Sequence, residues 1–198
     1  MQVDRELVVS TAAGIADTEG FDALTLTRVA KELGISQPAL YRHVEGFDDL
    51  VRSLGLLGRQ ALAEALREAA IGVGSDDAVR AMGHAWRRVV RERPGAYAAT
   101  DRYPCAGDEE LEAAVDELVD IIGNALVGYD LDDENRVHAA RTLRSTFHGF
   151  AHLEAGDGHP HPNDLDDTFD HIIDLLCCLL YTSPSPRDAT LSRMPSSA

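Results

Sequence analysis

The chain has 198 residues, a formal net charge of −16 and 44% hydrophobic residues, which is enough apolar material for a packed core. The acidic balance excludes a protein that coats nucleic acid indiscriminately, because affinity for phosphates comes from Lys and Arg. No run reaches the roughly 18 apolar residues of a membrane span, and residues 1–5 lack the pattern of a signal peptide, so we expect a cytoplasmic protein with no membrane partner.

Apolar residues recur with helical spacing almost throughout, and no segment alternates with the period of a strand. Polar caps and glycines mark where the helices begin and end. In chain order, the predicted helices lie between Asp4 and Gly20, between Thr25 and Gly34, over 37–44, from Phe47 to the region of Gly72, over 76–92, after Pro94, and over 108–126, 132–155 and 164–180. We therefore predict an all-α fold.

Residues 25–44 contain two short predicted helices joined by a turn. Thr25 and Ser36 are suited to cap the two helices, and Gly34 can take the left-handed conformation that the turn needs. The side chains that can pack this pair against the first helix are Val29, Ala30, Leu33, Ile35, Leu40 and Val44. The segment is predicted to be a helix-turn-helix, whose second helix lies in the major groove of DNA.

The remaining side chains of this segment suit contacts with DNA. Gln37 and Arg42 can reach base edges, because Gln pairs favourably with adenine and Arg with guanine. Pro38 and Ala39 offer apolar contact to a thymine methyl group. The side chains expected to donate to phosphates are Thr27, Arg28, Tyr41 and His43.

Two runs in this segment, Gly34-Ile35-Ser36 and 39–44 (Ala-Leu-Tyr-Arg-His-Val), resemble the turn and recognition helix of the tetracycline-repressor (TetR) family. The resemblance covers residues 4–50. It implies a homodimer that binds palindromic double-stranded DNA and is released by a small-molecule effector, with the helices 132–155 and 164–180 pairing between subunits. One departure is Phe47, which stands where the family usually has a phosphate-binding Lys.

Two alternatives to a repressor stay open. The chain could be a transcriptional activator, or a helical binding module that kept the helix-turn-helix shape without reading DNA. No Gly-x-Ser-x-Gly elbow, phosphate-binding glycine loop or nucleophile with an adjacent base is present, so we predict neither an enzyme nor a cofactor.

The resemblance also predicts how the chain is divided. We expect a helix-turn-helix DNA-binding domain over 1–47, a helical ligand-binding and dimerisation domain over 48–180, and a Ser- and Pro-rich tail over 181–198 that is either disordered or not native to the protein. The segment 147–149 is similar to the Trp-His-Gly signature of one TetR subgroup, with Phe147 in place of the Trp. Side chains that could line an effector pocket, or simply fill the core, are Met82, Trp86, Tyr97, Tyr103, Phe147, His148 and Phe150.

Metal binding is not predicted. His148 and His152 are spaced i, i+4, and His159 and His161 follow in the next loop, but no carboxylate has the placement of a His-Glu-x-x-His motif. The cysteines also lack metal-site spacing, and we expect reduced structural thiols. They are Cys105, Cys177 and Cys178.

Overall fold

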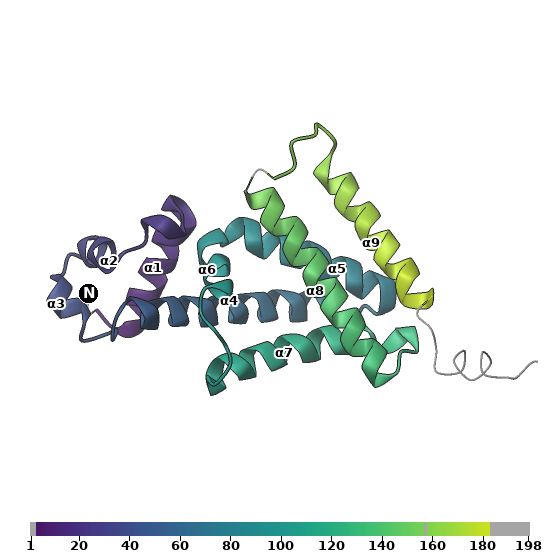
Figure 1. Cartoon of the computed structure of the whole chain (residues 1–198), viewed down its shortest axis with the longest axis horizontal. Coiled ribbons are helices and arrows are strands. Elements are labelled where there is room, and N and C mark those ends of the chain that lie inside the picture. The colour runs from purple at the N-terminus through teal and green to yellow at the C-terminus, as the bar shows by residue number, and fades with distance from the viewer. Residues whose placement is uncertain (1–2, 157, 183–198) are drawn as a thin grey trace, which may run out of the picture. The chain divides into compact units, whose positions relative to one another are not determined.

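The computed structural model describes residues 3–156 and 158–182, and these form helices joined by turns, with no strand among them (Figure 1). The all-α prediction is therefore confirmed. The α-helices and the short 3-10 helices (η) are α1 (Arg5–Glu19), η1 (Phe21–Ala23), α2 (Leu26–Leu33), α3 (Gln37–Leu40), α4 (Phe47–Ala70), α5 (Ser75–Glu92), α6 (Pro94–Ala98), η2 (Ala99–Asp101), α7 (Glu109–Ala125), η3 (Val127–Tyr129), α8 (Asp133–Ala155) and α9 (Leu165–Thr182).

Two boundaries differ from the expected ones by two residues or more. Helix α3 ends at Leu40 rather than at residue 44, because the amides of Arg42 and His43 bond to carbonyls three residues back, at 3.3 and 2.9 Å, which tightens the backbone into turns. Helix α9 runs on to Thr182, into the start of the predicted tail. The rest of that tail, 183–198, lies outside the described residues.

The chain divides into two compact units. The first comprises Met1–Ala65 and Arg88–Leu118, and the second comprises Leu66–Arg87 and Val119–Ala198. The predicted domain boundary at residue 47 falls inside the first unit, so the assignment of DNA reading to residues 1–47 stays a prediction. In the part of the chain that the structure describes, no helix combines the length and hydropathy that a bilayer span requires.

Helix α1 lies at the centre of the first unit. Its side chains pack with those of α2, α3, α6 and the start of α4 in one apolar core. The buried members of this core are Val8, Ala12, Ala13, Ile15, Ala16, Leu24, Leu26, Val29, Ala30, Leu40, Val44, Leu50, Leu54, Ala96 and Ala99, with Leu33 and Ile35 partly buried against them. The six side chains predicted to pack the helix-turn-helix are all among them.

Helix α6 sits directly on α1. The Asp17 carboxylate accepts hydrogen bonds from the amides of Gly95 and Ala96, at 2.8 and 3.0 Å, and so satisfies amides that the first turn of a helix leaves free. The backbones approach so closely that a Cβ on Gly95 would lie 2.2 Å from the carbonyl carbon of Ala16. Only glycine fits at this contact.

In the second unit, aromatic rings from α5, α8 and α9 pack together. Phe169 is completely buried, and its ring centroid lies 5.9 Å from that of Phe147 and 4.7 Å from that of Phe150. Arg87 is 5% exposed and holds Glu154 through two hydrogen bonds of 2.6 Å, while its third bond reaches Asp166 at the same distance. These contacts tie α5 to α8 and α9, because a buried guanidinium is stable only when its charge and donors are matched.

We expect Gly95→Ala to destabilise the protein, because the new methyl group would overlap the α1 backbone and force the helices apart, at a cost of about 1–3 kcal/mol. The matched control is Gly14→Ala in α1, where nothing lies within 4 Å of the added Cβ. This control should stabilise the helix by about 0.5–1 kcal/mol. Urea unfolding followed by circular dichroism measures both, and equal stabilities for the two variants would contradict the close approach of α6 to α1.

Candidate nucleic-acid interface

The turn between α2 and α3 is built from three local signals. The Thr25 hydroxyl accepts a hydrogen bond from the Arg28 amide at 3.1 Å, and the Ser36 hydroxyl accepts from the Ala39 amide at 3.3 Å. Gly34 has a φ of 67°, in the left-handed region, and ends α2. The predicted caps and the predicted glycine turn are therefore confirmed.

The outward side of this segment carries most of the residues predicted to contact DNA. Leu40 is completely buried and anchors α3 to α1. Around it, Gln37, Pro38, Tyr41 and Arg42 are exposed, Tyr41 by 51%. Donors and a flat phenol ring are thus presented by a short element whose other side is fixed in the core.

The flanking candidates are more constrained. The exposed Thr27 hydroxyl donates to the Gln37 amide oxygen at 3.2 Å, which orients the Gln37 side chain. Ala39 and His43 are half-buried. Ala39 and His43 therefore belong to the same short segment as the exposed candidates, and Thr27 is held beside it from α2.

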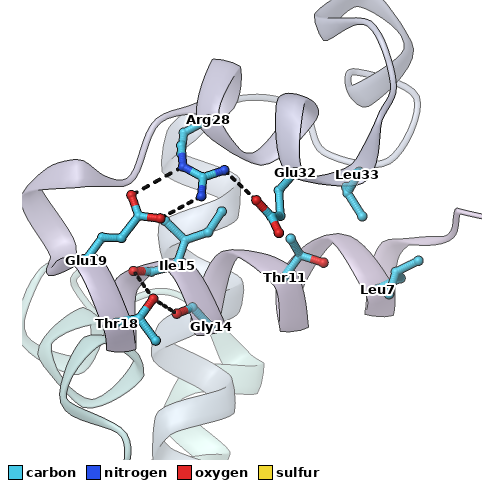
Figure 2. A pocket seen from close by; sticks show the side chains of 9 residues that line it. All are labelled: Leu7, Thr11, Gly14, Ile15, Thr18, Glu19, Arg28, Glu32 and Leu33. Atoms are coloured by element: carbon cyan, nitrogen blue, oxygen red, sulfur yellow. Dashed lines mark hydrogen bonds and ion pairs between the residues drawn. The ribbon is translucent and has the colours of Figure 1, made fainter.

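Arg28 is the exception among the predicted phosphate donors. Its guanidinium bonds to Glu19 at the end of α1, at 2.6 Å, and to Glu32 one turn further along α2, at 2.7 Å. Figure 2 shows the side chain lying between these two carboxylates. Hydrogen bonds donated to Glu19 and Glu32 raise the pKa of Arg28, and these two carboxylates already balance its charge.

These three residues line a groove of about 470 Å³ between α1 and α2 (Figure 2). The other residues along it are Leu7, Thr11, Gly14, Ile15, Thr18 and Leu33. Within the groove the ion pairs join the end of α1 to α2, so Arg28 acts as a link between the first two helices.

Arg5 is a residue that sequence reasoning missed. Its guanidinium donates to the His43 carbonyl at 2.8 Å, to the Asp49 carboxylate at 2.5 and 2.9 Å, and to the Ser53 hydroxyl at 2.8 Å. Asp49 in turn accepts from the Glu45 amide, and the hydrogen bond from Arg5 lowers the pKa of the Asp49 carboxyl. This cluster joins the start of α1, the end of residues 37–44 (the predicted recognition segment) and the first turn of α4.

Helix α4 begins at Phe47. Phe47 is 37% exposed and is followed by Asp48 and Asp49. A cavity of about 420 Å³ opens here, and Tyr103, one of the predicted effector contacts, lines it. The other lining residues are Glu45, Gly46, Phe47, Asp48, Asp49 and Arg52.

The other predicted effector contacts are divided between the units. Tyr97 is buried in the first unit. In the second unit the rings of Trp86 and Phe147 lie 6.3 Å apart, and the half-buried His148 stacks on His152 at 5.8 Å. Met82, Trp86, Phe147 and Phe150 are all buried there. Phe169, at the centre of these rings, was not among the predicted residues.

Two family profiles match the chain. The profile described as bacterial regulatory proteins, tetR family, matches residues 8–54, and the one described as tetracyclin repressor-like, C-terminal domain, matches residues 79–176. The HTH-type transcriptional regulator Rv0681 of Mycobacterium tuberculosis is 35% identical over 154 residues, which cover 77% of this chain and 71% of that protein.

The chain belongs to the TetR family of transcriptional regulators. The HTH-type regulator YobS of Bacillus subtilis is a further relative, 28% identical over 163 residues that cover 81% of this chain and 84% of that protein. The TetR family protein ActR of Streptomyces coelicolor, solved in complex with (S)-DNPA, shares the fold, with a TM-score of 0.68 and 19% identity over 93% of this chain and 100% of that one. The predicted class, a DNA-binding regulator and not an enzyme, is therefore confirmed.

We expect Arg28 and Arg42 to differ in their contribution to DNA binding by this TetR-family regulator. Arg42→Met should cost about 1–3 kcal/mol of binding free energy and relax specificity at the base pair that Arg42 reads. Removal of a phosphate contact would instead reduce the slope of log affinity against log salt by about 1. Arg28→Met should leave the slope unchanged and lower thermal stability, because its ion pairs with Glu19 and Glu32 are internal. Fluorescence anisotropy at several salt concentrations measures the slope. A reduced slope for Arg28→Met would contradict this expectation and indicate that Arg28 contacts a phosphate.

Proposed function

We propose that this TetR-family regulator is a homodimeric repressor that binds a palindromic operator in double-stranded DNA and leaves it when a small molecule binds. The observation that carries the proposal is the exposed set Gln37, Tyr41 and Arg42 on a capped segment that Leu40 anchors in the core. Because bacterial operators lie in the cytoplasm, we place the protein there.

In this proposal some of the side chains contact bases and the others contact the phosphate backbone. Gln37 and Arg42 read base edges, with Pro38 and Ala39 against a thymine methyl group. Tyr41 donates to the phosphate backbone and, with Thr27 and His43, fixes the register of the recognition segment. Arg5 holds that segment through the His43 carbonyl.

The outward faces of α8 and α9 support the homodimer. Leu175 and Leu179 are 52% and 62% exposed on α9, and Leu153 is 49% exposed on α8. The opposite face of α9 carries Phe169 and Ile173, which are completely buried. A helix with apolar residues on both faces needs a second partner, and a symmetric copy of the same pair of helices supplies one.

Release by a ligand follows from population shift. Two recognition segments in a dimer match a palindrome only at one separation, so a ligand that binds better to a dimer of another separation weakens DNA binding. The repressor-like description of the matched C-terminal profile and the ligand complex of ActR support this assignment. Of the residues proposed as effector contacts, a pocket in the first unit would use the buried Tyr97 and the half-buried Tyr103. A pocket in the second unit would use the buried Met82, Trp86, Phe147 and Phe150 with the half-buried His148.

Selection of binders from a pool of random duplex DNA tests the proposed operator recognition. We expect the full chain to enrich a palindrome with two equal half-sites. Replacing Tyr41 and Arg42 together by Ala should weaken binding to the enriched sequence by about 10–100-fold, because the double variant can make neither the bidentate hydrogen bonds to a base nor the bond to a phosphate. Arg91→Ala, an exposed arginine of α5, serves as a control for the change in charge.

Two outcomes would contradict this proposal. The recognition segment is misassigned if the double variant binds as tightly as the parent. A folded, dimeric protein that enriches no sequence at low salt would be the non-reading helical module instead, with Phe47 and the acidic start of α4 as the first explanation.

A charged residue on the outward face of α9 tests the dimer. We expect Leu175→Glu to produce monomers, because two-fold symmetry places two new charges in one apolar interface. The matched control is Val127→Glu, in which an apolar residue that is 65% exposed in the same unit is replaced. Sedimentation velocity distinguishes the two species. Monomers from both variants, or from neither, would remove α9 from the proposed interface.

A further inference from the structure

Two arginines on the same face of α4 reach the connection between η2 and α7. Arg52 and Arg59 are seven residues apart, about two helical turns, so their side chains leave the helix in nearly the same direction. Arg52 pairs with Asp108 and with Glu110, the latter at 2.8 Å. The hydrogen bond from Arg52 lowers the pKa of the Asp108 carboxyl to about 2. The charge of Arg52 is therefore balanced twice over.

Arg59 reaches the same connection but finds no carboxylate. It is 6% exposed. Its Nη2 donates to the Thr100 carbonyl at 2.6 Å and lies 2.9 Å from the Cys105 sulfur. Its Nη1 is buried without a hydrogen-bond partner, and no acidic side chain in the described ranges comes within ion-pair distance.

A buried cation in this state is energetically unfavourable. Charges leave water at a tolerable cost only when they are paired and their donors are filled, and sulfur is a weak acceptor. Gly55 lies beside the unfilled donor, and a Cβ at that position would come within 3.0 Å of both Nη1 and the Ala99 carbonyl oxygen. The helix thus presents a buried donor with a charge to balance, which is what an anionic ligand requires.

We propose that Arg59 binds the anionic group of the effector, and that the effector is therefore a carboxylate. This inference rests on the proposed ligand response and specifies its chemistry. The carboxylate accepts hydrogen bonds from Nη1 and Nη2 together, the bidentate geometry that a guanidinium favours, and takes Nη2 from the Cys105 sulfur. Because Nη1 has no exposure to solvent, the ligand must displace the atoms that cover it.

The position of Arg59 also connects the proposed ligand site to α1, which supports the helix-turn-helix. Thr100, whose carbonyl accepts from Arg59, donates through its hydroxyl to the Tyr97 carbonyl at 2.7 Å. Tyr97 belongs to α6, which packs on α1 through Gly95. A carboxylate bound to Arg59 therefore acts on a guanidinium that is linked through Thr100 to α6, the helix that packs on α1.

Binding of carboxylates beside their neutral amides tests this proposal. The probes are hexanoate and benzoate, compared with hexanamide and benzamide, and the readouts are the melting temperature of the full chain and calorimetric binding. We expect the carboxylates, and not the amides, to raise the melting temperature. Arg59→Met should weaken carboxylate binding at least about tenfold, because Met cannot form the charge-assisted hydrogen bonds of the guanidinium.

Two further variants keep the test decisive. Arg52→Met removes a cation from the same face of α4 and should lower the melting temperature while preserving the preference for carboxylates. Arg59→Lys retains the charge and should retain only part of the preference for carboxylates. If Arg59→Met does not fold, a full preference in Arg59→Lys would count against the bidentate contact with Arg59. Equal binding of carboxylates and amides, binding of neither, or an unchanged preference in Arg59→Met would overturn the proposal.

Failure of this proposal and of the proposed function are distinguishable. A protein that enriches an operator but shows no preference for carboxylates is a regulator whose effector is not held by Arg59. If the protein binds carboxylates through Arg59 but enriches no DNA, the anion site is supported and the proposed function as an operator-binding repressor is wrong.

Discussion

The first unit depends on the small side chains of α1. Ala12 and Ala16 are buried on a helix that α2 and α6 both contact, and neither position has a side chain beyond Cβ. Larger residues would separate the helices, since protein interiors are close-packed and even one extra methylene group can destabilise the fold. The glycine at 95 extends the same constraint to α6. The helix-turn-helix is therefore held on a support that is as closely packed as a domain core.

Residues 1–47 contain few positively charged side chains. Arg5 and Arg28, two of these, form ion pairs with carboxylates of the same unit. Arg5 is bound to Asp49 and the His43 carbonyl, and Arg28 is bound to Glu19 and Glu32. What remains at the recognition segment is Arg42 with neutral donors around it. In a chain of net charge −16, this arrangement limits attraction to phosphates in general.

Local features of the fold could be predicted from the sequence, and long-range pairings could not. Thr25, Gly34 and Ser36 act within three or four residues of themselves, so their roles follow from residue type and spacing. Arg5 finds Asp49 across 44 residues, and nothing in either neighbourhood indicates the pair. Arg28 looks like a phosphate donor in the sequence because its residue type suits one, and only the position of Glu19 shows where its guanidinium goes.

The early end of α3 has a similar cause. The pattern of residues 37–44 fits a helix, and Val44 is buried as expected, but the turns that begin at Tyr41 depend on how the chain must redirect into α4. Phe169 was overlooked because an aromatic residue in a helical pattern gives no sign that the rings of His84, Phe147 and Phe150 converge on it. The effector-contact set drawn from residue types also spans both units, a division that periodicity does not reveal.

The carboxylate cap on α6 has a consequence for how the molecule opens. Asp17 belongs to α1, yet it accepts from the amides of Gly95 and Ala96, nearly 80 positions away in the chain. Those two amide hydrogens are shielded only while α1 is folded and α6 is seated on it. Their rate of exchange with deuterated water therefore reports on the folding of α1 from a site outside that helix, and should follow the slowest-exchanging amides of α1.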